Sequence, residues 1–166
     1  SPAMIDGANF VGGRWVPAVP GQTFTRRNPP DPADVIGTSP ASAPAGVRIA
    51  VDALDKAAPE WAATSPGRRA AILESAAMQL ESRSAQLIGE LVREEGKTTA
   101  EATMEVRRTP ANLRFYAAEA TRSAGATYPA ARAPLPYTIP DPLLHLRRDP
   151  PRLLPVQLSA PQSAPA

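Results

Sequence analysis

The 166-residue sequence contains no cysteine and only one histidine, His145. Without cysteine the chain has no disulfide, no thiolate metal ligand and no thiolate nucleophile. Small secreted scaffolds held together by disulfides are excluded for the same reason. His145 lies in a proline-rich stretch with no pair of carboxylates nearby, so we expect it to have no catalytic or metal-binding role. Ser75 and Ser82 have no histidine partner within helical reach, and we expect no Ser-His-Asp triad.

Strong charge of one sign and long apolar runs are also missing. The formal net charge is +2, too small to indicate a nucleic-acid surface, and we expect the arginine pairs at 26–27, 68–69 and 107–108 to be solvated. No apolar run reaches the length of a membrane span, and we find no signal-peptide pattern. We therefore expect a soluble, cytoplasmic chain with neither a nucleic-acid nor a membrane partner.

Proline, by contrast, is abundant. The chain has 21 prolines, and ten of them lie between Pro129 and Pro165. Each proline removes a backbone donor and restricts the residue before it, so no helix can propagate there. The pattern predicts three regions: a hairpin and extended segment over 1–43, a helical region over 44–128, and a proline-rich irregular tail over 129–166.

The first region has the pattern of short strands. Phe10–Val11 and Trp15–Val16 flank Gly12–Gly13, a two-glycine turn typical of hairpins because both residues can adopt positive φ. Further strands are expected at Phe24–Thr25 and at 35–37. We interpret Gly12–Gly13 as a turn and not as a phosphate-binding loop, because no Gly-x-Gly-x-x-Gly pattern links a strand to a helix.

Three helical segments are expected in the second region. The first runs from about residue 45 to residue 62, where Pro59 should kink the helix or end it early. The next starts at Ser65–Pro66, has a joint at Arg83–Ser84 and stops at Gly96. The last begins near Thr98 and is expected to bend at Pro110. The expected apolar stripes are Val47, Val51, Leu54, Ala58 and Trp61; Ala70, Leu73, Ala77 and Leu80; Leu87, Leu91 and Val92; and Met104, Val106, Leu113, Tyr116 and Ala120.

Two further features could belong to a site. Glu94 and Glu95 precede a helix-ending glycine, where carboxylates are usually solvated, although a general-base pair is the alternative. Trp15 and Trp61 are expected to be core and hairpin anchors and not a binding cage.

Six sequence blocks, in order, carry a resemblance to a known family. The match covers roughly residues 9–129, with weaker agreement to Pro150. The blocks are Asn9–Val16, Asn28–Gly37, Val51–Trp61, Ser65–Leu73, Glu94–Lys97 and Arg114–Ala120. Together they resemble the N-terminal portion of the NAD(P)-dependent aldehyde dehydrogenases.

The resemblance implies an α/β fold in three parts: a doubly wound cofactor domain, a catalytic domain and a small oligomerising sheet. It implies NAD or NADP as cofactor, a cysteine that attacks the aldehyde, and a glutamate that activates water. None of these catalytic, cofactor-binding or metal-binding positions can be carried onto this sequence. In some family members an acidic residue at the position of Glu94 helps to hold a structural monovalent cation.

The expected function follows from this mismatch. We expect a truncated aldehyde dehydrogenase that neither oxidises aldehydes nor binds the cofactor tightly on its own. We expect an aldehyde substrate to bind only to a full-length form of the protein. The helices would pack on an absent sheet, so Leu73, Ala77, Leu80, Leu113 and Tyr116 should face water and favour self-association or homo-oligomers. The alternative is a non-catalytic helical interaction module.

The tail suggests a change of reading frame. Arg147–Pro150 is similar to the family's Arg-Arg-Glu-Pro, but the glycine- and valine-rich continuation is missing. Residues 155–160, written in suitable codons and read one base later, encode Pro-Phe-Asn-Phe-Pro, which resembles the next family motif. We expect an insertion or deletion between about Asp149 and Pro155, and the alternative is a genuine divergent tail. Sequencing the coding DNA beyond Pro150 would distinguish the two.

Overall fold

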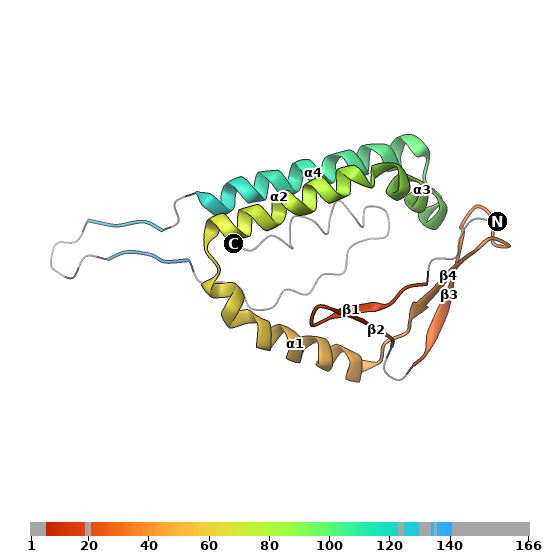
Figure 1. Ribbon diagram of the computed structural model, residues 1–166, viewed down its shortest axis with the longest axis horizontal. Helices are drawn as coiled ribbons and strands as arrows, with labels where there is room; N and C mark the ends of the chain where they lie inside the picture. Colours follow the sequence, from red (N-terminus) through yellow and green to blue (C-terminus); the bar gives the residue numbers. More distant parts are fainter. Residues whose placement is uncertain (1–5, 19–20, 123–124, 130–133, 135, 141–166) are drawn as a thin grey trace.

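A computed structural model describes residues 6–18, 21–122, 125–129, 134 and 136–140. Two small two-stranded sheets precede four helices (Figure 1). The strands are β1 (Asn9–Val11), β2 (Arg14–Val16), β3 (Thr23–Arg27) and β4 (Val35–Pro40), and the helices are α1 (Pro44–Ala63), α2 (Pro66–Ser82), α3 (Ser84–Glu95) and α4 (Thr99–Thr121). This arrangement is consistent with part of an α/β fold, and it confirms the predicted strands and helices.

The first hairpin has the predicted turn. Gly12 and Gly13 have φ values of 57° and 77°, the conformation that pairs short strands with a matching twist. Phe10 pairs with Trp15 across the strands, and their ring centroids lie 5.0 Å apart. The side chains are nevertheless 63% and 72% exposed. Trp15 is therefore an anchor of the hairpin, and it lies outside the buried core.

Helix α1 continues through Pro59 to Ala63, so of the two predicted effects of Pro59, a kink or an early end, the early end does not occur. It has no buried residue. Most of its apolar stripe faces outward, with Val47, Val51 and Leu54 being 59%, 40% and 48% exposed. In Figure 1, α1 lies apart from the pair formed by α2 and α4.

The helix ends follow the sequence closely. Ser65 caps α2, since its side-chain oxygen accepts from the Arg68 amide at 3.3 Å. Gly96 ends α3 in the left-handed region at φ 69°. Thr98 and Glu101 form a reciprocal capping box at the start of α4, which satisfies two of the helix's orphan donors.

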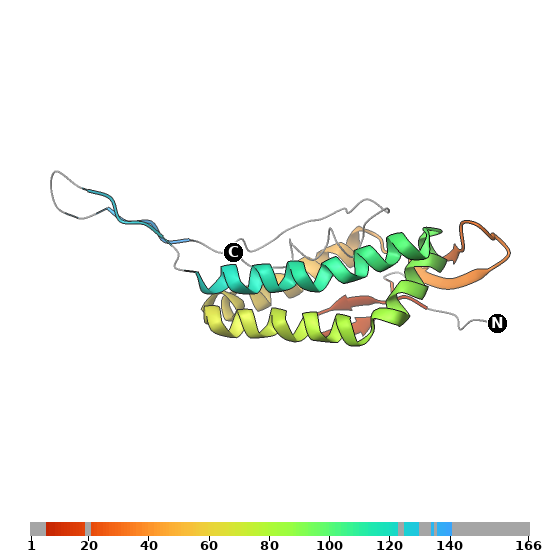
Figure 2. The same cartoon turned by 90° about the horizontal axis from the view of Figure 1, so that it is seen from above.

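The largest packed unit is the pair α2 and α4, which run side by side in both views (Figures 1 and 2). Leu73 and Ala77 of α2 form a buried cluster with Leu113 and Ala117 of α4. Pro110 is buried within α4, which is uninterrupted. A second buried cluster, made of Leu91, Ala102 and Val106, joins α3 to α4.

These two clusters correct one expectation from the sequence. Leu73, Ala77 and Leu113 do not face water, and Leu80 and Tyr116 are partly buried against the same cluster. The reason is that α2 and α4 each turn their apolar stripe toward the other helix. Among the described residues, exposed apolar side chains remain on α1, on the hairpins and on the outer faces of α2 and α4.

Candidate functional site

Charged residues concentrate at the carboxyl end of α3. Arg93, Glu94, Glu95 and Lys97 surround Gly96, and we call these four residues with their partners the α3-end cluster. The partners lie on three different elements: Arg26 on β3, Asp34 in the β3–β4 turn and Glu105 on α4. The cluster therefore connects the second hairpin to the helices.

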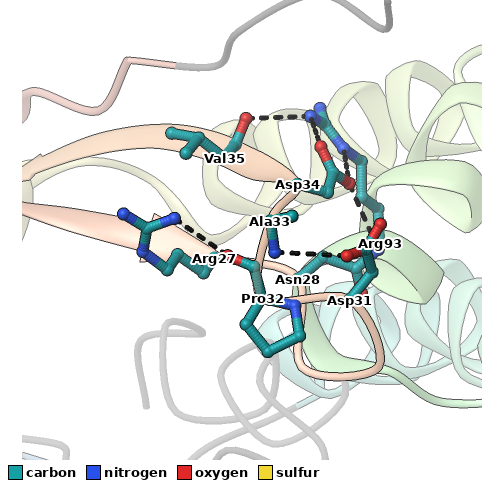
Figure 3. Close-up of polar contacts among 8 residues, drawn as sticks. All are labelled: Arg27, Asn28, Asp31, Pro32, Ala33, Asp34, Val35 and Arg93. Atoms are coloured by element: carbon teal, nitrogen blue, oxygen red, sulfur yellow. Dashed lines mark hydrogen bonds and ion pairs between the residues drawn. The ribbon is translucent and has the colours of Figure 1, made fainter.

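The best-defined part is the contact between Arg93 and Asp34 (Figure 3). Arg93 Nε donates to Asp34 Oδ2 at 2.9 Å, and its Nη2 donates to Oδ1 at 2.7 Å. The same Nη2 donates to the Val35 carbonyl at 3.0 Å, and Asn28 Nδ2 donates to Asp34 Oδ2 at 3.2 Å. Such a two-pronged contact fixes orientation as well as distance. The hydrogen bond from Arg93 lowers the pKa of Asp34 to about 2.

The second contact joins Arg26 to Glu94. Arg26 Nη1 donates to Glu94 Oε1 at 2.6 Å, and the two side chains are 12% and 39% exposed. The guanidinium is thus nearly buried, whereas the carboxylate still meets solvent.

The third contact is the most buried. Lys97 Nζ lies 2.6 Å from Glu95 Oε2 and 2.6 Å from Glu105 Oε2. The Lys97, Glu95 and Glu105 side chains are 10%, 7% and 1% exposed. Burial opposes ionisation of the Lys97 ammonium, but hydrogen bonds to Glu105 and Glu95 outweigh it and raise the pKa of Lys97.

Local backbone geometry brings these side chains together. The β3–β4 turn is closed by backbone hydrogen bonds from Asn28 to Asp34 at 3.0 Å and from Asp34 to Asp31 at 2.9 Å. Gly96 packs directly on this turn, since a Cβ there would lie 2.8 Å from Pro30 Cδ. A side chain at residue 96 would therefore be strained both by the left-handed φ and by Pro30.

The structure also locates the residues that the sequence singled out. The expectation that Glu94 and Glu95 are solvated was wrong for Glu95, which is buried beside Lys97, and incomplete for Glu94, which is ion-paired. Ser75 and Ser82 make hydrogen bonds with Gln79 on the surface of α2. His145 and the proposed frame change lie outside the described residues.

The contacts of the cluster are suited to holding the hairpin against the helices and not to catalysis. Its cations are bound to carboxylates, and it contains no nucleophile. No group of three or more potential metal ligands occurs within the described parts of the chain. The carboxylate of Glu94 does not fit a bound monovalent cation, because the Arg26 guanidinium lies against it.

One further surface feature lies on α2, outside the residues of the cluster. An open groove of about 520 Å³ runs along α2, with Arg68 and Arg83 lining it together with Ile72 and Gln79. Among the described residues, no helix is long and apolar enough to cross a membrane.

An acid-stability prediction follows from the Arg93–Asp34 contact. The folded-state pKa of Asp34, about 2, lies below its ordinary value of 3.8. The stabilisation from this carboxylate is therefore complete above about pH 4 and is lost as the pH falls toward 2. We expect Asp34→Asn to lower the urea midpoint at about pH 6, and the difference from the parent chain to shrink steadily toward about pH 2.

Arg93→Gln is the matched variant for this test, because it removes the cause of the shift and keeps the carboxylate. The urea midpoint of Arg93→Gln should therefore fall less between about pH 4 and pH 2 than that of the parent chain, as expected for Asp34→Asn. A difference between Asp34→Asn and the parent that stays constant across the acid range would contradict the assignment.

The fold and its contacts define an N-terminal hairpin region joined by ion pairs to a helical unit. A sequence profile described as "Aldehyde dehydrogenase family" matches residues 15–144. The chain belongs to the aldehyde dehydrogenase family.

Individual relatives agree with this assignment. The chain is 42% identical over 103 residues to the bifunctional protein PutA of Escherichia coli, covering 62% of this chain and 8% of that protein. It is 34% identical over 122 residues to the alpha-ketoglutaric semialdehyde dehydrogenase of Bacillus subtilis, covering 74% and 25%. It also resembles the crystal structure of an NAD-dependent aldehyde dehydrogenase from Sinorhizobium meliloti, with a TM-score of 0.73, 28% identity and coverage of 76% and 26%. The chain thus spans a quarter or less of the length of these two curated relatives.

Sequence reasoning missed Asp34 and Glu105, and its expectation that Arg26 is solvated was wrong, because the Arg26 side chain is 12% exposed and paired with Glu94. Asp34 stands in the Asn-Pro turn that carried part of the resemblance, and that turn could have drawn attention to it. Arg26 and Glu105 had no comparable pattern, because their partners lie 68 and 8 residues away in the sequence.

Proposed function

We propose that the chain supplies the N-terminal helical frame of an NAD(P)-dependent aldehyde dehydrogenase and does not oxidise aldehydes by itself. The observation that supports this most directly is the family match over residues 15–144 in a chain without cysteine. The family reaction needs a thiolate to attack the aldehyde carbon, and no other side chain present replaces it. Aldehyde and NAD or NADP would therefore meet this segment only within a larger assembly.

The frame in this proposal has a defined mechanical role. The α2–α4 pair forms a closed apolar unit, and the α3-end cluster attaches the second hairpin to it through ion pairs. The exposed apolar face of α1 would then be available to the cofactor domain. We place the boundaries of the three regions at residues 43 and 128.

Cofactor binding tests this proposal. We expect calorimetric titration of the purified chain with NAD or NADP to show no saturable heat up to millimolar nucleotide. A full-length family member is the positive control. Micromolar binding by this chain would contradict the proposal, because it would require a nucleotide site within these residues.

The alternative is a non-catalytic interaction module, which the closed core between α2 and α4 favours. The two functions differ in how the chain behaves alone. Sedimentation analysis that shows a monodisperse monomer with a sharp two-state melt would favour the interaction module. Concentration-dependent self-association through the exposed α1 face would favour an incomplete enzyme frame.

A further inference from the structure

Among the described residues, the α3-end cluster has one more carboxylate than cations. The carboxylates are Asp34, Glu94, Glu95 and Glu105, and the cations are Arg26, Arg93 and Lys97. Glu94 and Glu95 lie at the carboxyl end of α3, where unpaired carbonyls add a partial negative charge. Among these described residues, loss of one cation would leave two more carboxylates than cations.

Each cation has a distinct position within this arrangement. Arg93 uses Nε and Nη2 on Asp34, and Lys97 lies between Glu95 and Glu105. Arg26 crosses from β3 to reach Glu94 at 2.6 Å with a side chain only 12% exposed. Within the described residues, Arg26 is the cation that neutralises Glu94.

We propose that the Arg26 guanidinium takes the place of a monovalent metal ion at Glu94, so that the chain folds independently of Na⁺ and K⁺. A guanidinium is always charged and is tethered beside the carboxylate, whereas a free ion must be drawn from solution. Removal of the Arg26 charge leaves Glu94 with a local negative field that a small cation can enter. The inference concerns this one position and does not depend on catalytic activity.

The experiment compares thermal unfolding in NaCl, KCl and choline chloride at equal ionic strength. The variants are Arg26→Gln, which removes the charge, and Arg26→Lys, which keeps it. Arg122→Gln is the control, because it breaks the exposed Arg122–Glu119 pair, in which Arg122 is 75% exposed. We expect the parent chain, Arg26→Lys and Arg122→Gln each to melt at the same temperature in all three salts.

Arg26→Gln should differ from these three proteins. In choline chloride we expect its melting temperature to fall by about 2–5 °C, the scale of one partly exposed ion pair. NaCl or KCl should restore part of this loss in a saturable manner. Such a result would show that the Arg26 guanidinium occupies the place beside Glu94 that a metal ion would otherwise take.

Three results would overturn the proposal. The first is a parent chain stabilised by Na⁺ or K⁺ over choline, because a metal ion would then bind beside Arg26. The second is an Arg26→Gln variant that melts at the same temperature as the parent in choline chloride. The third is an Arg26→Gln variant whose melting temperature changes equally with all three cations. If Arg26→Gln does not fold, calorimetric titration of the parent chain with NaCl tests the proposal instead. Saturable heat with NaCl but not with choline chloride would contradict it. No saturable heat with NaCl would support it.

Discussion

Replacement of Lys97 by methionine is expected to destabilise the fold by about 3–5 kcal/mol, the usual effect of removing one partner of a buried ion pair. Lys97 is the cation between Glu95 and Glu105, whose side chains are 7% and 1% exposed. Methionine fills a similar volume but leaves both carboxylates buried beside an apolar chain. Urea unfolding followed by circular dichroism measures the change.

The double variant Lys97→Met with Glu105→Leu separates charge from packing. Because an apolar pair can replace a buried ion pair at little cost, the double variant should lose clearly less stability than Lys97→Met alone. The double variant could instead lose as much stability as Lys97→Met alone, or as much as the two single variants added together. Either result would show that Lys97 contributes by packing and not by neutralising Glu105.

The second large effect is expected at the contact between α2 and α4. Leu113 is 6% exposed and packs in the cluster with Leu73, Ala77 and Ala117. Truncation of such a leucine to alanine removes buried methyl groups and leaves a cavity, which typically costs about 2–5 kcal/mol. We expect a loss of this size in urea unfolding of Leu113→Ala.

Met104 on the same helix provides the matched control. It is 63% exposed, so Met104→Ala should change the free energy of unfolding by no more than about 0.5 kcal/mol. Similar losses of stability at Leu113 and Met104 would contradict a core formed by α2 and α4. Such a result would agree instead with the sequence expectation that the apolar stripe of α4 faces water.

Local features of the fold could be predicted from the sequence because each depends on a few neighbouring residues. Gly12–Gly13 defined the first turn, Ser65–Pro66 the start of α2 and Gly96 the end of α3. The family assignment was equally accessible, since it depended on the order of short blocks.

The packing of the helices could not be predicted in the same way. The periodicity of Leu73 and Leu113 showed that each helix has an apolar stripe, but it did not show which surface would cover it. The sequence interpretation expected the stripes to face water because the family's sheet is absent from this chain, whereas in the structure the two helices cover each other. The effect of Pro59 was also not fixed by the sequence, because α1 tolerates the lost hydrogen bond near its last turn and continues to Ala63.

The ion pairs were the least predictable part. Glu95 seemed solvated because it precedes a helix-ending glycine, yet the return of the chain into α4 places Glu105 and Lys97 around it. Arg26 and Glu94 are 68 residues apart, and only the folded hairpin brings them together. Contacts of this kind depend on tertiary structure and leave no periodic pattern in the sequence.

The central claim is that this aldehyde dehydrogenase family chain supplies structure and not the reaction. Formation of reduced nicotinamide cofactor from a panel of aliphatic, aromatic and semialdehyde substrates, with NAD or NADP and purified chain, tests it most directly. We predict no rate above that of the buffer at any chain concentration, while a full-length family member is active in parallel. A rate that rises in proportion to the concentration of the chain and disappears when the chain is unfolded would contradict the account.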